Sequence, residues 1–113
     1  MSSQQAAIQF TYPRSAESSF NLDHYMHKHI PLVGNCWGEH GMRSWFVIVG
    51  DNNASYHVQT TFFWDSLEAF EKVDKTVVMD DVKNFSKVEA STQFGMVAGQ
   101  GTYGIGGFTY LEV

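Results

Sequence analysis

Two residues in the first third of the chain, Tyr25 and His29, have the types and the spacing for acid/base chemistry. Four positions apart, they lie one turn apart on the same side of a helix. An imidazole in a partly apolar pocket can take a proton from an activated carbon or hydroxyl, and a neighbouring phenol can orient the substrate or stabilise an oxyanion. The same side of the helix is otherwise apolar, which is equally typical of a satisfied histidine in a hydrophobic core. Both interpretations are compatible with the sequence.

The helix that would carry this pair has a well-defined start and an expected end. Asn21 can cap it by accepting a backbone N–H, and Phe20 and Tyr25 fit a hydrophobic staple. Pro31 has no N–H to donate and disfavours helical geometry in the residue before it. We therefore expect the helix to kink or end near Pro31.

Four further residues are candidates for the walls of a substrate pocket around this pair. Three are large aromatics that could enclose a flat or apolar ligand: Tyr12, Trp37 and Trp64. The fourth, His57, lies in the middle of an expected strand, on the face opposite Tyr56. It meets the pocket only if that face looks toward the helices, and is otherwise a polar strand residue near an edge.

The remaining histidines give a weak signal for a metal site. Asp23 and His27 are one turn apart and His24 is nearby. However, these residues lie largely on the face opposite His29, and two or three ligands without thiolates are not diagnostic of a metal. We interpret them as solvated surface and expect no metal and no cofactor.

Two other reactive groups are also interpreted without a catalytic role. Asp80 and Asp81 could form a carboxylate pair, but adjacent residues rarely face the same way, so we expect capping or solvation. Cys36 has no basic neighbour that would lower the pKa of its thiol, so we do not expect a nucleophile there.

Length and charge restrict the class of protein. The chain has 113 residues, enough for one domain with a single core. Its net charge of −5 and its scattered basic residues argue against nucleic acid and against an anionic membrane surface as partners. The lone Cys36 fits a reducing compartment, and no segment is long enough to span a membrane. We therefore expect a soluble cytoplasmic protein.

The hydrophobic pattern predicts an α+β fold. Strands are expected at 6–12, 44–49, 56–64 and 88–98, and helices at about 21–30, from a capping box at 65–68, and over part of 75–85. The order β-α-β-β-α-β is that of a ferredoxin-like fold, with helices on one face of a four-stranded antiparallel sheet. The continuous apolar run at 44–49 predicts a strand buried on both faces.

The other face of this sheet needs a partner. The third strand carries apolar residues on both of its sides, and the second strand is apolar throughout. Because so much apolar surface is not left in water, we expect a homodimer in which two sheets pack face to face.

The chain divides into three parts. Residues 1–5 are expected to form a flexible N-terminus, and 6–100 the folded domain. Residues 101–113 form a glycine-rich C-terminal extension, whose end could add a strand to its own sheet or to a partner's sheet.

Four segments resemble the EthD-domain family, named for ethyl tert-butyl ether degradation. The sequences FNLDHY at 20–25 and HIPLV at 29–33 resemble its signature helix, FWDSLEAF at 63–70 its second helix start, and MDDVKNF at 79–85 its short motif before the last strand. The resemblance covers about residues 6–100 and implies a dimeric α+β barrel. Asn21 and His24 depart from the family pattern, which usually has Asp and commonly an aromatic at these positions.

The residues and the resemblance together support two hypotheses of different classes. The first is a small homodimeric, cofactor-free enzyme acting on a hydrophobic ring-containing or polyketide-like molecule or a lactone, as a monooxygenase, isomerase or cyclase. His29 would be its acid/base group and Tyr25 the helper. The second is a non-catalytic ligand-binding or accessory protein of a catabolic pathway that uses the same cavity.

Overall fold

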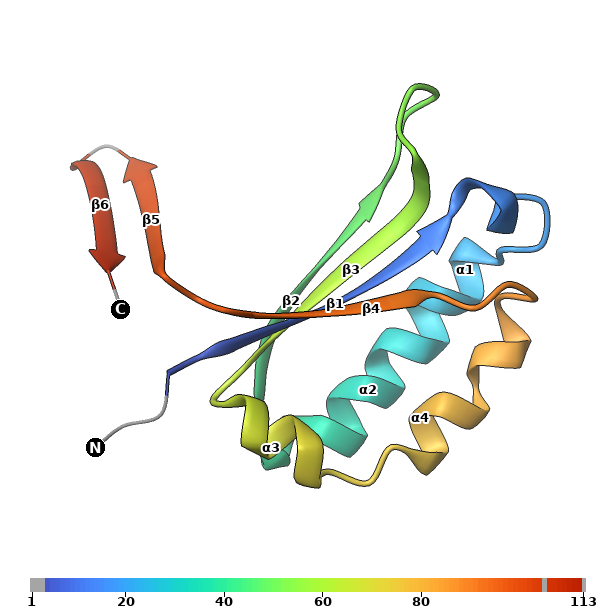
Figure 1. Ribbon diagram of the computed structural model, residues 1–113, viewed down its shortest axis with the longest axis horizontal. Coiled ribbons are helices and arrows are strands. Elements are labelled where there is room, and N and C mark those ends of the chain that lie inside the picture. Colours follow the sequence, from blue (N-terminus) through green and yellow to red (C-terminus); the bar gives the residue numbers. More distant parts are fainter. Residues whose placement is uncertain (1–3, 105, 113) are drawn as a thin grey trace.

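The main sheet of the structure has four antiparallel strands (Figure 1). The computed structural model describes residues 4–104 and 106–112, the last five of these by their backbone. Residues 1–3 of the expected N-terminal segment therefore lie outside the described part. The strands of the sheet, in the spatial order β2-β3-β1-β4, are β1 (Ala6–Pro13), β2 (Met42–Val49), β3 (Tyr56–Trp64) and β4 (Ser91–Met96).

The helices lie together on one face of this sheet (Figure 1). In chain order they are α1 (Leu22–His24), a π-helical turn (Tyr25–His29), α2 (Ile30–Trp37), α3 (Leu67–Lys72) and α4 (Thr76–Asp80). Short 3-10 turns occur at Arg14–Ala16, Gly38–His40 and Val82–Asn84. The predicted α+β, ferredoxin-like order is confirmed. Among the described residues, no helix is long and apolar enough to cross a membrane.

The first helix does not end near Pro31, because it runs on to Trp37. The alternative that we expected, a kink near Pro31, stays a prediction. Pro31 occupies the first turn of α2, where a missing N–H has least effect. The chain before it widens into a π-helical turn, in which the Ile30 N–H donates to the Tyr25 carbonyl five residues back. The expected cap is confirmed, since the Asn21 side chain accepts the His24 N–H at 3.0 Å.

The core is the aromatic layer between sheet and helices. Alternate residues of β1 and β3 point into it and are buried, among them Ile8, Val58 and Phe62. The opposite face of the sheet is open and carries a polar row: the Gln9 amide donates to Thr61 Oγ1 at 3.2 Å, and the Gln59 amide donates to Thr11 Oγ1 at 3.2 Å.

Strand β2 corrects a second expectation. The run 44–49 was expected to be buried on both faces, but β2 is an edge strand and most of it is exposed. Trp45, Phe46, Ile48 and Val49 are all exposed large side chains, with Phe46 64% exposed. Hydrophobic periodicity carries no information on the place of a strand in its sheet, which is why the sequence pattern could not locate this edge.

The C-terminal extension forms a two-stranded sheet of its own, separate from the main sheet (Figure 1). It is an antiparallel hairpin of β5 (Gly99–Gly104) and β6 (Gly107–Glu112), which we call the C-terminal hairpin. Residues 105 and 113 of the extension lie outside the described part.

Two glycines provide a matched test of the backbone geometry. Gly41 has φ = 116°, and a Cβ there would lie 3.0 Å from the Ala69 Cβ, so we expect Gly41→Ala to lower the free energy of unfolding by about 1–3 kcal/mol. Gly34 lies within α2 with open space around it, so Gly34→Ala should raise that free energy by about 0.5–1 kcal/mol. Chemical denaturation measures both, and equal effects would contradict the left-handed geometry at Gly41.

Candidate functional site

His29 and Asp81 come together although they are far apart in the chain. His29 is the last residue of the π-helical turn, and Asp81 directly follows α4. The His29 Nδ1 lies 2.9 Å from Asp81 Oδ2, and His29 is only 5% exposed. Because an ionised carboxylate can only accept hydrogen bonds, Nδ1 carries the proton and Nε2 keeps its lone pair. The geometry is that of an imidazole held in one tautomer by a carboxylate.

Asp81 is itself held by two further side chains. The Asn84 amide donates to Oδ1 at 2.8 Å, and the His24 Nε2 lies 3.1 Å from both carboxylate oxygens. Burial raises the pKa of Asp81, but hydrogen bonds from Asn84, His29 and His24 outweigh burial and hold that pKa below its usual value. Asp81 is therefore an ionised carboxylate at neutral pH.

His29 is a neutral base rather than an imidazolium. Burial lowers the pKa of His29, and the nearby Asp81 carboxylate offsets only part of that effect. At neutral pH the ring therefore keeps one basic nitrogen, and among the described residues Nε2 has no hydrogen-bond partner.

Tyr25 packs against the same imidazole. The two rings are stacked, with centroids 5.3 Å apart and planes inclined by 18°. The Tyr25 hydroxyl lies 2.6 Å from Thr60 Oγ1 on β3. Burial raises the pKa of Tyr25 to about 12, while the Thr60 hydrogen bond acts in the opposite direction. Tyr25 is thus a neutral phenol that can donate a hydrogen bond.

His29 and Tyr25 line a small, partly open and largely apolar cavity between the sheet and the helices. Its other walls are Phe10, Tyr12, Val33, Trp37, Phe62, Val78, Met79 and Val82. The volume is about 20 Å³, which is room for about one water molecule. The lining combines a few polar groups with apolar walls, as small-molecule sites do, but the volume is far below that of such sites.

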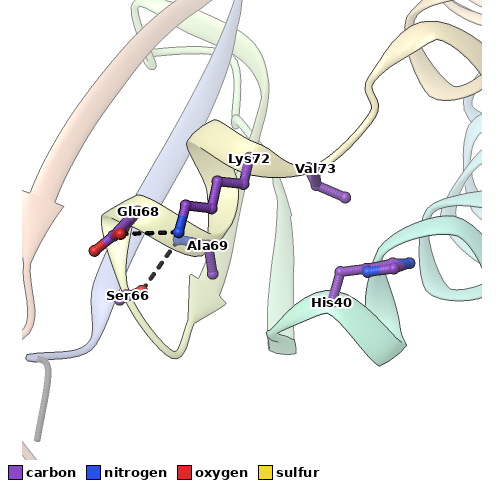
Figure 2. A pocket seen from close by; sticks show the side chains of 6 residues that line it. All are labelled: His40, Ser66, Glu68, Ala69, Lys72 and Val73. Carbon is purple, nitrogen blue, oxygen red and sulfur yellow. Dashed lines mark hydrogen bonds and ion pairs between the residues drawn. The ribbon is translucent and has the colours of Figure 1, made fainter.

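A larger hollow on the surface lacks this character. Figure 2 shows it beside α3, with a volume of about 360 Å³ and a lining of His40, Ser66, Glu68, Ala69, Lys72 and Val73. Its polar groups are largely satisfied by one another: Lys72 Nζ lies 3.0 Å from Glu68 Oε1, and Ser66 Oγ accepts the Ala69 N–H. The His40 ring lies apart from that ion pair (Figure 2). The cavity lined by His29 and Tyr25 is therefore the better candidate site.

The structure separates the four proposed wall residues into two groups. Tyr12 and Trp37 line the cavity together with Tyr25 and His29. Trp64 is fully buried but stands outside that lining, with its ring 5.5 Å from Trp37. His57 also lies outside the lining, with its ring 5.4 Å from Phe20.

Asp81, His24 and Thr60 were missed by the sequence analysis as parts of this site. Asp81 was expected to be a solvated or capping residue and His24 a solvated surface residue, yet their side chains are only 15% and 24% exposed. The contact joins positions 52 and 57 residues apart, and its formation depends on how the segment after α4 lies against α1. No local spacing in the sequence reports that arrangement.

The buried His29 makes stability depend on pH. The pKa of His29 in the folded protein lies below that of a histidine in the unfolded chain, which is about 6.5. The contribution of His29 to the free energy of unfolding is therefore fully present above about pH 6.5 and is lost as the pH falls through the folded pKa. The lowered pKa of Asp81 changes the stability of the fold only at more acidic pH, where that carboxylate takes up a proton. We expect Tm to fall between about pH 7.5 and 5.5, and to fall less steeply in His29→Gln than in the exposed control His27→Gln. Equal slopes by calorimetry would contradict a neutral buried His29.

Two solved structures are similar to this one. An EthD-like protein from Ralstonia eutropha has a TM-score of 0.72 at 19% identity, with 84% of this chain and 93% of that chain covered. An ethyl tert-butyl ether (EthD) family protein from Bacillus halodurans has a TM-score of 0.58 at 19% identity, with 81% and 96% covered. No family model and no curated protein matches the chain. The resemblance to EthD-domain proteins is thus confirmed for the fold, and the chain folds as an EthD-like α+β domain.

Proposed function

We propose that this chain is a homodimeric member of the EthD family and a cofactor-free enzyme that uses His29 for acid/base chemistry. Its substrate would be a hydrophobic ring-containing or polyketide-like small molecule or a lactone. The observation that carries the proposal is the partly buried 2.9 Å contact between His29 Nδ1 and Asp81 at the wall of an apolar cavity. The lone Cys36 supports a reducing compartment, such as the cytoplasm, as its location.

The role of each group follows from its protonation state. Neutral His29 takes a proton at Nε2 from an acidic carbon or hydroxyl of the substrate. The imidazolium that forms is stabilised by Asp81, which holds Nδ1–H and remains ionised because Asn84 and His24 donate to it. Removing a proton leaves negative charge on the substrate, and the apolar walls strengthen every electrostatic contact to that charge.

Tyr25 is suited to stabilise the developing oxyanion. A phenol with a pKa of about 12 stays protonated and remains a donor. When Thr60 donates to the Tyr25 oxygen, the phenol proton is left for a substrate oxygen. Stacking on His29 keeps this donor and the base on the same side of the cavity.

A ring-sized substrate fits only if one of the side chains that line the cavity moves. A cavity with room for about one water cannot hold a ring, so a side chain must move. Met79 lines the cavity, is half exposed and is unbranched, which makes it the wall residue that can swing aside at least cost.

Catalysis and simple binding are separated by matched variants. We would follow turnover of a panel of anthrones, phenols and unsaturated lactones by absorbance, together with binding by calorimetry. We expect His29→Gln to lower kcat by about 10²–10⁴, since that is the usual contribution of a general base. Asp81→Asn should lower kcat less, and the exposed His27→Gln should retain wild-type turnover. Binding without turnover by the wild type would instead favour the non-catalytic ligand-binding protein.

The homodimer is supported by the open face of the sheet. This face carries Phe46 and Phe63, with ring centroids 6.0 Å apart, beside the polar row that includes Thr61. In the described part of the chain no helix covers this mixed apolar and polar face, which suits packing against a second copy of the same face.

A charge in the middle of that face should break the dimer. We expect Thr61→Lys to raise the dimer dissociation constant at least about tenfold, because the lysine would be buried against its own copy. Val77→Lys, at an exposed position of α4, is the matched control and should leave the dissociation constant unchanged. Sedimentation equilibrium measures both, and a monomeric wild type would refute the proposed dimer.

A further inference from the structure

The C-terminal hairpin stands apart from the rest of its own protomer (Figure 1). Within the described residues, the extensive contacts of β5 and β6 are with each other only. Every residue of β5 is exposed, and Tyr103 is 79% exposed. A lone two-stranded hairpin is marginally stable in water at best, so a partner surface is needed to keep it ordered.

The hairpin is poorly placed to find that surface on its own sheet. Val97 is anchored beside the start of β1, since its N–H donates to the Gln5 carbonyl at 2.9 Å and its carbonyl accepts from the Gln4 side chain. The hairpin begins only two residues later, at Gly99, and leads away from the main sheet (Figure 1). The short tether therefore directs it outward.

A matching unpaired element exists at the opposite edge of the same sheet. Within the described part of the chain β2 is an edge strand, as is β4, so half of the backbone N–H and C=O groups of β2 have no strand partner there. It has no proline, and its exposed side chains Trp45, Phe46 and Val49 are apolar. Such an edge pairs readily with another strand unless it is covered. β2 and β4 are separated by β3 and β1, about 14 Å, so the hairpin that leaves β4 starts on the wrong side to cover its own β2.

We propose that the C-terminal hairpin is an exchanged arm, which adds its strands to the free β2 edge of a second copy of this chain. Each chain has one arm and one free β2 edge at opposite sides of its sheet, so a two-fold pair satisfies both arms and both β2 edges. A different protein on β2 would leave the arm unpartnered. Main-chain hydrogen bonds supply the affinity, as in other cases of strand addition.

The composition of β5 suits this contact. Gly99, Gly101 and Gly104 leave the backbone of β5 accessible to another strand, because they carry no side chain. Tyr103 offers a large amphipathic ring to the exposed aromatics of β2. The arm rests on the proposed homodimer and adds a second, separate contact to the sheet-to-sheet packing.

Cross-linking in the full chain locates the arm. Benzoylphenylalanine replaces Tyr103, labelled and unlabelled chains are mixed, and photoproducts are mapped by mass spectrometry. We expect adducts between different chains at residues 42–49. The same cross-linker at the exposed Val77 of α4 is the control and should give no adduct there. Adducts confined to one chain, adducts between chains elsewhere, or no adducts would overturn the arm.

A second variant separates the arm from the dimer itself. Thr102 lies in the middle of β5, opposite Thr109. Thr102→Pro disrupts the strand and should raise the dimer dissociation constant at least about tenfold, whereas Thr102→Val keeps the strand and should stay within about threefold of the wild type. An unchanged constant in Thr102→Pro would overturn the arm and leave the sheet-to-sheet dimer standing. A wild-type chain that is monomeric would overturn both.

Discussion

The Asp81 carboxylate is the contact on which the site depends. It joins two parts of the chain, the segment of α1 and α2 and the turn after α4, by accepting hydrogen bonds from His24, His29 and Asn84. A largely buried carboxylate is costly unless it is fully paired. The position of the α4 wall, the tautomer of His29 and the closure of the cavity therefore follow from one set of polar contacts.

An aromatic frame surrounds this polar centre. The Phe85 ring lies 4.5 Å from His29 and 4.8 Å from Tyr25, measured between centroids. Tyr12 stands edge-on to Phe85 at 5.8 Å. Aromatic packing of this kind restricts ring motion, so the imidazole is held by carboxylate contacts on one atom and by ring contacts on its faces. The fold thus presents a base in a fixed orientation without any further element.

The order and faces of the elements could be predicted because they are encoded locally. Alternation along β1 and β3 and the Asn21 cap act over a few residues, and each is found in the structure. The capping box expected at 65–68 is shifted by one residue, because Ser66 rather than Asp65 is the N-cap of α3 and accepts the Ala69 N–H. The exposure of β2 and the pairing of Asp81 could not be predicted from the sequence, because the first depends on the order of the strands and the second on how distant segments pack together. Pro31 led to the wrong prediction of a helix end for a related reason. A proline also fits the first turn of a helix when the turn before it widens.

That widened turn places the two side chains that we propose for the chemistry, Tyr25 and His29. The π-helical turn at Tyr25–His29 holds one residue more than an α-helical turn between the Asn21 cap and Pro31. Loss of a single residue from it would restore a regular α-helical turn while α1 and α2 keep their orientation, because the wide turn takes up one extra residue locally. The side chains within the turn would change direction, and Tyr25 and His29 are its first and last residues. The extra residue of this turn therefore affects how Tyr25 and His29 face the cavity and leaves the helices on either side in place.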